Sequence, residues 1–211
     1  MGQVVSLTAE SETRTKPNHK ISYEEFLEWY DEHHAEWVDG EIIMGQPATF
    51  EHQADSDFLT QLLGLYIQAR DLGVLVSAPF QMRLQEQKSG REPDMLFVSK
   101  EHVGRIKRTY LDGPADLVIE IISPESVGRD RGDKFVEYEA AGIPEYWLID
   151  PQRRQAEFYR LDNENRYQLV TYGKEGTFHS QVIDGFFLKI DWLWQKPLPK
   201  VLPILKEMGI S

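Results

Sequence analysis

Two carboxylates in this chain have the setting of catalytic or metal-binding acids. Glu120 lies within the aliphatic run LVIEIISP, and Asp94 opens the apolar run DMLFV. An ionised acid inside a fully buried strand is unfavourable unless a partner offsets its charge. If the two strands pair antiparallel, the start of one lies beside the end of the other. The sequence therefore predicts that the two carboxylates converge in one poorly solvated site.

A divalent cation would allow both acids to stay ionised, because two neighbouring carboxylates raise each other's pKa. Hard oxygen ligands favour Mg²⁺ or Mn²⁺, which keep water ligands and bind phosphates. Such a site needs a positive group to orient the attacking water or to stabilise the transition state, and Lys134 is the candidate. Asp130 and Tyr138 lie one helical turn before and after Lys134, so the three share a helix face.

Each of these residues also has an ordinary structural explanation. Asp94 is a common type of turn residue, and Glu120 could reach water at a strand edge. Lys134 could form a helical ion pair with Asp130 worth only about 0.3–0.5 kcal/mol. Tyr138 could equally be a core aromatic. Glu120 argues most strongly for a site, because unpaired acids are rarely buried.

The elements that must position these residues follow from hydrophobic periodicity and turn signals. Ser22 and Glu25 have the spacing of a capping box, which predicts a first short helix. Asp39-Gly40 predicts a tight hairpin within AEWVDGEIIMG. A long amphipathic helix is expected over 51–70 and another helix over 130–141, with strands at 74–77, 80–84, 94–98, 117–122 and 145–150. The helix between the last two buried strands predicts a parallel crossover.

The segment from 99 to 113 contains the clearest basic cluster of the chain, and it connects the two acid-bearing strands. This loop or short helix is a candidate for contacts with a DNA backbone through Lys100, Arg105, Lys107 and Arg108. Beyond it, alternation over 156–188 predicts an antiparallel meander. The last residues predict a helical cap that is broken by Pro199 and Pro203.

Composition limits the classes of function. The 211 residues suit one domain over 21–211, preceded by a flexible tail over 1–20. The net charge of -12 excludes a general electrostatic grip on nucleic acid, so any DNA contact must be local. Absence of cysteine excludes disulfides, thiol catalysis and cysteine-bound zinc. We expect a cytoplasmic protein without a membrane span.

Taken in order, several motifs resemble the Uma-two family of restriction endonucleases, within the PD-(D/E)XK nuclease superfamily. They are AEWVDGEI, EHQ at a helix start, REPDMLFV, DLVIEIISPES, DKFVEYEAAGIPEYWLIDP and DGFFLKI. The resemblance implies an α/β, restriction-endonuclease-like fold: a mixed central sheet flanked by helices, with an N-terminal helix and hairpin and a C-terminal antiparallel extension. It also implies magnesium-dependent hydrolysis of phosphodiester bonds.

The resemblance assigns roles to individual residues. Asp94 matches the aspartate of the PD element, and Glu120 matches the acid of the (D/E)XK element. Ile122 stands where that element has its lysine. Similar families supply this lysine from the next helix, which makes Lys134 the replacement.

The start of the long helix resembles the family's first-helix element. There, Glu51 and His52 would add a metal-linked acid or a DNA contact, and Tyr138 would support Lys134 from the later helix.

The sequence thus predicts a DNA endonuclease that uses Mg²⁺, or Mn²⁺, and no organic cofactor. A homodimer is expected, because a cut through duplex DNA needs two sites. Two alternatives stay open. One is a DNA-binding module of the same fold with little or no catalysis, and the other is a protein-binding adaptor with an acidic surface.

Overall fold

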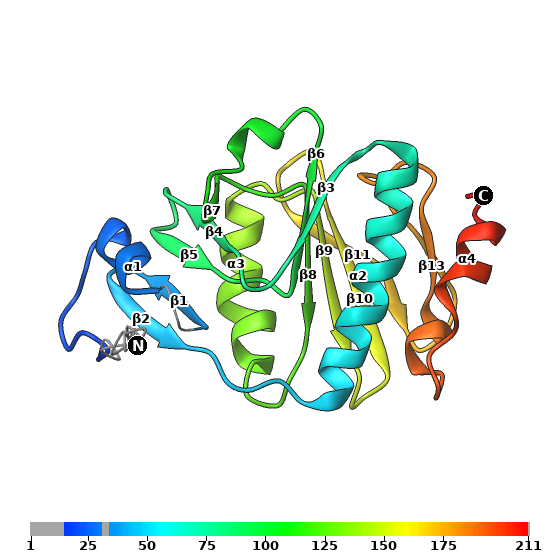
Figure 1. The fold of residues 1–211 in the computed structure, drawn as a ribbon, viewed down its shortest axis with the longest axis horizontal. Coiled ribbons are helices and arrows are strands. Elements are labelled where there is room, and N and C mark those ends of the chain that lie inside the picture. The colour runs from blue at the N-terminus through cyan, green and yellow to red at the C-terminus, as the bar shows by residue number, and fades with distance from the viewer. Residues whose placement is uncertain (1–14, 31–33, 211) are drawn as a thin grey trace, which may run out of the picture.

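The computed structural model describes residues 15–30 and 34–210, and its centre is a mixed six-stranded sheet (Figure 1). The strand order is β11-β10-β9-β8-β6-β3, and only β8 and β9 pair in parallel. The strands are β3 (Gly73–Ser77), β6 (Met95–Ser99), β8 (Leu117–Ile121), β9 (Glu145–Asp150), β10 (Gln155–Leu161) and β11 (Tyr167–Gly173). The mixed α/β fold and the predicted parallel crossover from β8 to β9 are confirmed.

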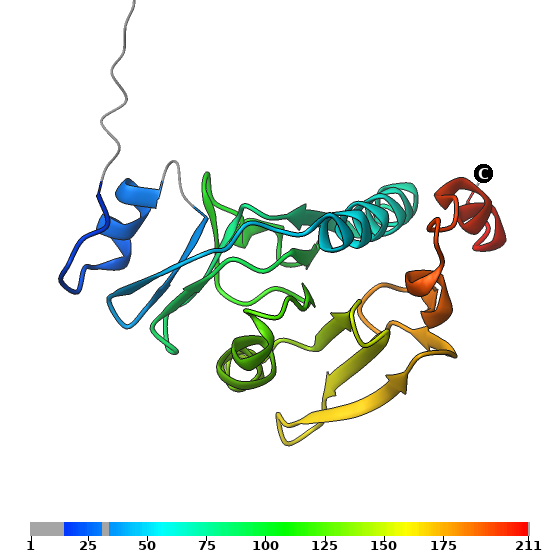
Figure 2. The same cartoon turned by 90° about the horizontal axis from the view of Figure 1, so that it is seen from below.

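Both faces of the large sheet are covered, as Figure 2 shows. Helix α2 (Phe50–Arg70) lies on one face and α3 (Lys134–Ala140) on the other. Along β6, Met95 and Phe97 join the core under α2, whereas Leu96 and Val98 join the core under α3. This alternation is that of a strand buried on both faces.

A second sheet of five strands, in the order β2-β1-β5-β4-β7, lies beside the α3 face. Its strands are β1 (Ala35–Val38), β2 (Glu41–Met44), β4 (Gln81–Leu84), β5 (Ser89–Arg91) and β7 (Tyr110–Asp112). Asp39 and Gly40 both have positive φ in the β1–β2 turn, as the predicted tight hairpin requires. Helix α1 (Tyr23–Trp29) packs against this hairpin, and its predicted capping box is present.

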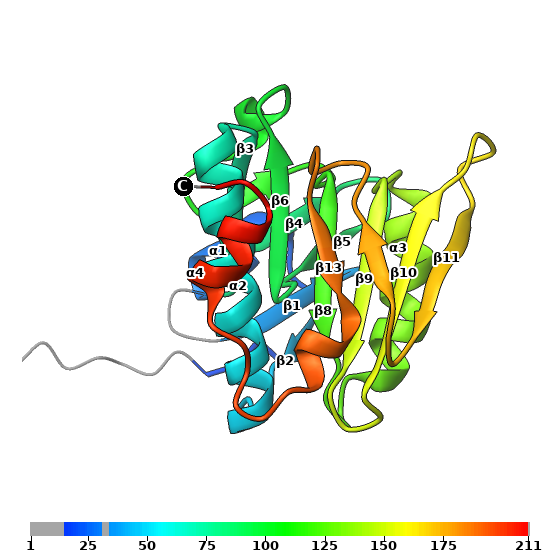
Figure 3. The same ribbon diagram turned by 90° about the vertical axis from the view of Figure 1, so that its right-hand side faces the viewer.

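The chain after β11 packs on the α2 face, where α4 (Val201–Glu207) lies beside α2 (Figure 3). The prediction of one continuous meander over 156–188 is wrong. Instead, β12 (Thr177–His179) pairs with β13 (Phe187–Lys189) in a separate sheet. The terminal helix is also not broken at Pro203, which occupies the first turn of α4. Proline is tolerated there because first-turn N–H groups have no partner within the helix. Before α4, η4 (Ile190–Trp194) forms a short 3₁₀ turn.

Residues 1–14 of the predicted flexible tail lie outside the described residues. The end of that tail contacts the first hairpin, where Lys20 Nζ lies 2.7 Å from an Asp39 carboxylate oxygen. Within the described ranges, no helix has both the length and the apolar character that a bilayer crossing requires.

Candidate active site

Glu120 is placed by the pairing of β8 with its neighbours. It is 3% exposed and points to the same face of the sheet as Val118 and Ile122, toward α3. Ile122 is packed in the core of that face, so the position of the expected lysine is filled by an apolar side chain. The cation that reaches Glu120 comes from α3 instead.

Lys134 and Tyr138 both donate to the same oxygen of Glu120. Lys134 Nζ lies 2.9 Å from Glu120 Oε1, and the Tyr138 hydroxyl lies 3.0 Å from it. The two side chains are one turn apart on α3, and a π-helical turn, Arg129–Asp133, precedes them. Asp130 in that turn lies 3.4 Å from Lys134 Nζ through Oδ1. The predicted shared face of Asp130, Lys134 and Tyr138 is therefore present and turned toward Glu120.

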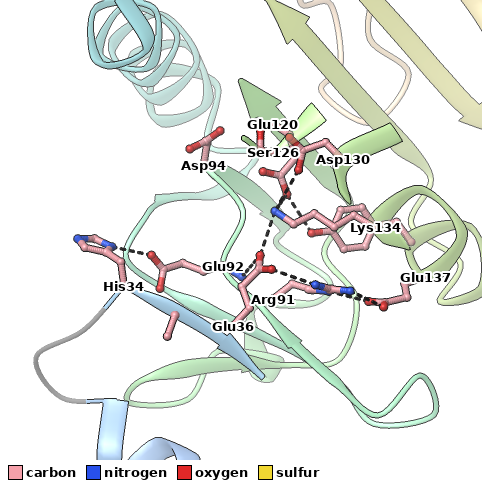
Figure 4. Close-up of polar contacts among 12 residues, drawn as sticks. His34, Glu36, Arg91, Glu92, Asp94, Glu120, Ser126, Asp130, Lys134 and Glu137 are labelled. Carbon is pink, nitrogen blue, oxygen red and sulfur yellow. Dashed lines mark hydrogen bonds and ion pairs between the residues drawn. The ribbon is translucent and has the colours of Figure 1, made fainter. Parts of the chain in front are cut away.

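Asp94 lies at the start of β6, next to the end of β8. The register pairs Met95 with Ile119, and Asp94 Oδ2 accepts a 2.6 Å hydrogen bond from the backbone N–H of Ile121. Both acids line one cavity of about 920 Å³. The antiparallel pairing that the sequence predicted for the two acid-bearing strands is confirmed, and it brings Asp94 and Glu120 to one site (Figure 4).

The two residues at the start of α2 behave differently. His52 lines the cavity, and its Nε2 lies 3.2 Å from Asp94 Oδ1. Burial lowers the pKa of His52, but contact with Asp94 and the backbone of Ile121 more than offsets this and raises it. Glu51 is exposed and is not part of the cavity wall. Of the predicted first-helix pair, only His52 is brought to the acids.

Glu36 is a site residue that the sequence reasoning missed. It comes from β1 of the small sheet, and its Oε1 lies 2.9 Å from Lys134 Nζ. Its other oxygen accepts a 2.9 Å hydrogen bond from Arg91 on β5. The only local signal was an acid between Ala35 and Trp37 in a strand, and its partners are distant in sequence.

The buried acids of the site outnumber the cations that contact them. Burial, together with Asp130, Asp94 and Glu36, raises the pKa of Glu120 well above its usual range despite Lys134. Burial likewise raises the pKa of Asp130. Burial lowers the pKa of Lys134, but its carboxylate neighbours, Glu120 first, reverse this and raise it well above the usual range. Lys134 is therefore a charged ammonium group in a site with surplus negative charge.

This donor set fits a hard divalent cation. Asp94 and Glu120 offer carboxylate oxygens on the wall of the same cavity. Mg²⁺ is commonly held by one or two carboxylates, with water and phosphate completing its shell. In the described part of the chain, no group of three or more His, Cys, Asp or Glu side chains is arranged to hold a metal ion. The protein would thus supply a minority of the ligands, as Mg²⁺ sites that bind phosphate substrates do.

The predicted basic cluster lies at the other end of the acid-bearing strand. It follows the C-terminal end of β6, whereas Asp94 precedes that strand. Three of its cations have partners within the chain: Lys100 with Asp71, Arg105 with the Pro114 carbonyl, and Lys107 with the Gly104 carbonyl. The cluster is therefore not part of the cavity that contains Asp94 and Glu120.

Asp55 is a second residue that the sequence reasoning missed. It is 0% exposed on α2, and neither carboxylate oxygen has a hydrogen-bond partner among the described residues. Burial raises its pKa to about 6, although Lys196 and His52 act in the opposite direction. A signal was present: Asp55 lies four residues before Leu59, on the apolar stripe of the helix.

Comparisons with known proteins identify the family and the fold of the chain. The profile of the Uma2 family, described as "Putative restriction endonuclease", matches residues 23–191. The chain is similar in structure to a crystal structure titled as a putative nuclease belonging to DUF820 from Anabaena variabilis ATCC 29413. The TM-score is 0.70 at 17% identity, over 82% of this chain and 97% of that one. No curated protein matches the sequence.

Proposed function

Because the chain belongs to the Uma2 family, we propose that it hydrolyses DNA phosphodiester bonds with Mg²⁺ held by Asp94 and Glu120. The observation that carries this proposal is the position of Lys134. Its ammonium group lies 2.9 Å from Glu120 Oε1, in the cavity that Asp94 also lines. Asp94, Glu120 and Lys134 thus lie in one cavity, although the lysine comes from α3 and not from β8.

The residues of the site have distinct roles in the proposed hydrolysis, in which a water oxygen bonds to phosphorus and the sugar oxygen leaves. When bound, Mg²⁺ (or Mn²⁺) would neutralise phosphate charge and lower the pKa of a bound water. Lys134 remains protonated, so it does not act as a base. To donate a hydrogen bond to the attacking water or to a phosphate oxygen, its amine would give up its longest contact, the 3.4 Å contact with Asp130. Tyr138 keeps its proton as well, since burial raises its pKa well above the usual range, and it orients Glu120.

The test is nicking of supercoiled plasmid with Mg²⁺ as the only divalent ion. Glu120→Gln keeps the shape of the side chain but removes its charge, and it should reduce nicking by at least about 100-fold. Glu145→Gln is the matched control, because Glu145 is also a buried strand glutamate, paired with Arg160 at 3.2 Å. Full activity of Glu120→Gln would reject the proposal.

A DNA-binding module of the same fold with little catalysis is the second candidate, favoured by Ile122 at the position where the (D/E)XK element has its lysine. It predicts a mobility shift of DNA without nicking at any Mg²⁺ concentration. An adaptor for other proteins predicts neither a mobility shift of DNA nor nicking.

Endonuclease action on both strands of duplex DNA requires two active sites. We therefore expect a homodimer, which sedimentation equilibrium would detect.

A further inference from the structure

A closed set of buried ion pairs surrounds the amine that the proposed reaction uses. Lys134 Nζ contacts Glu120 at 2.9 Å, Glu36 at 2.9 Å and Asp130 at 3.4 Å. Two of these acids have fixed places beside the lysine, since Glu120 lies on the strand before α3 and Asp130 lies one turn away. Glu36 is different, because it reaches Lys134 from the other sheet (Figure 4).

Glu36 is itself held on its second oxygen. Arg91 is 1% exposed and donates a hydrogen bond to Glu36 Oε2 at 2.9 Å. It also donates two hydrogen bonds to the Glu137 carboxylate, at 2.8 and 2.5 Å. Glu137 lies on α3, one turn after Lys134. The contacts therefore form a loop from Lys134 through Glu36, Arg91 and Glu137 and back to α3.

We propose that Glu36 is a positioning residue, which holds the Lys134 amine against Glu120 from the side opposite the strand. Arg91 and Glu137 fix Glu36 in turn. A lysine on β8 would be aimed by the strand itself, whereas a long side chain from a helix has several rotamers. A second carboxylate across the amine removes that freedom. This inference rests on the proposed function, because the amine it positions is the one assigned to the reaction.

The charges of the group support this role. Burial raises the pKa of Glu36, but Lys134 and Arg91 together outweigh burial and hold it below the usual value. Glu36 is thus the ionised partner that meets Lys134 from the small sheet.

The decisive variant is Glu36→Gln, studied alone and together with Lys134→Met. Glu36→Gln should lower kcat for plasmid nicking about 10- to 100-fold, with KM for DNA and the affinity for Mg²⁺ changed less than about threefold. In the Lys134→Met background it should have no further effect on kcat, because Glu36 acts through the amine. An equal loss of kcat in both backgrounds would overturn the inference.

A crystal structure of Glu36→Gln provides a readout that does not need activity. The Lys134 amine should leave Glu120, and an amine that stays at the wild-type 2.9 Å would also overturn the inference. If the wild-type protein fails to nick DNA, the proposed function fails and this structure alone decides the positioning role.

Glu137→Gln is the second variant, in case Glu36→Gln does not fold. Glu137 is partly exposed, and its loss leaves all three acids around Lys134 in place. Glu137→Gln should lower kcat less than Glu36→Gln does, and this loss of kcat should again disappear in the Lys134→Met background. A loss of kcat that persists without the lysine would contradict the proposed chain of contacts.

Discussion

Lys134 Nζ lies within 2.9 Å of Glu120 Oε1 and within 2.9 Å of Glu36 Oε1, so one ammonium group joins carboxylates from two different sheets. All three side chains are buried. The consequences extend to stability as well as to chemistry, because a buried charge that loses its partner is costly.

Lys134→Met should destabilise the protein strongly. The substitution leaves Glu36, Glu120 and Asp130 without their shared cation, which corresponds to a loss of about 3–5 kcal/mol in the free energy of unfolding near pH 8. The loss should shrink toward pH 5, because Glu120 and Asp130 have raised pKa values in the folded state and take up protons. Urea denaturation at both pH values measures this.

Lys189→Met is the control for that experiment. Lys189 pairs with Glu207 at 2.6 Å, but both side chains are substantially exposed. Its loss should cost about 0–1 kcal/mol. An equal loss in the free energy of unfolding for the two lysine variants would show that the buried ion pairs contribute no more to stability than an exposed pair.

Mg²⁺ binding should depend on Asp94 and weaken as the pH falls. Glu120 has a raised pKa, so the metal competes with a proton, and binding should release protons. Calorimetry with MgCl₂ alone, in two buffers of different ionisation enthalpy, measures both the affinity and the proton release. Asp94→Asn should abolish the binding heat.

Asp116→Asn is a closely matched control for Asp94→Asn. Asp116 accepts a 2.7 Å hydrogen bond from the backbone N–H of Ser99 and lies 2.7 Å from His102, at the other end of the β6–β8 pair. Asp94 has the same two kinds of partner. Loss of the binding heat in both variants would point to a structural effect and against a metal ligand.

Asp55→Asn should stabilise the protein at alkaline pH. The folded-state pKa of Asp55 is raised from 3.8 to about 6, so its contribution is fully present below about pH 4 and is lost as the pH rises through 6. Removing the charge should gain on the order of 2 kcal/mol at pH 8 and little at pH 4. Asp57→Asn, an exposed change on the same helix, should stay within about 0.5 kcal/mol at both pH values.

The basic cluster can be tested through the salt dependence of DNA binding. If Lys107 and Arg108 contact phosphates, the double alanine variant should lower the slope of log K against log salt by about 2. Fluorescence anisotropy at several salt concentrations measures this slope. An unchanged slope would show that Lys107 and Arg108 have no part in DNA binding, and Lys200→Ala serves as an exposed-lysine control.

The parts of the site that the sequence predicted are those encoded by local pattern. The buried run around Glu120, the acid before β6 and the helical spacing of Lys134 and Tyr138 are all readable within short windows. Ile122 stands where the family's lysine is expected, and the resemblance to families that supply this lysine from the next helix pointed to Lys134.

The parts that the sequence did not predict depend on contacts between distant segments. Glu36 and Arg91 meet Lys134 only because the small sheet docks beside α3, and no local pattern specifies that docking. In the same way, β12 pairs with β13 and not with β11 because the chain crosses to the α2 face, which alternation alone does not encode.

The loop through Lys134, Glu36, Arg91 and Glu137 also has a consequence for folding order. Contacts between segments far apart in sequence are established late, since chain entropy opposes them. Before the two sheets dock, Glu120 and Lys134 can meet, but Glu36 is still absent. We therefore expect Glu36 to join the site only after Glu120 and Lys134 have met, so that a partly folded molecule would hold these two residues without the second carboxylate that fixes the lysine.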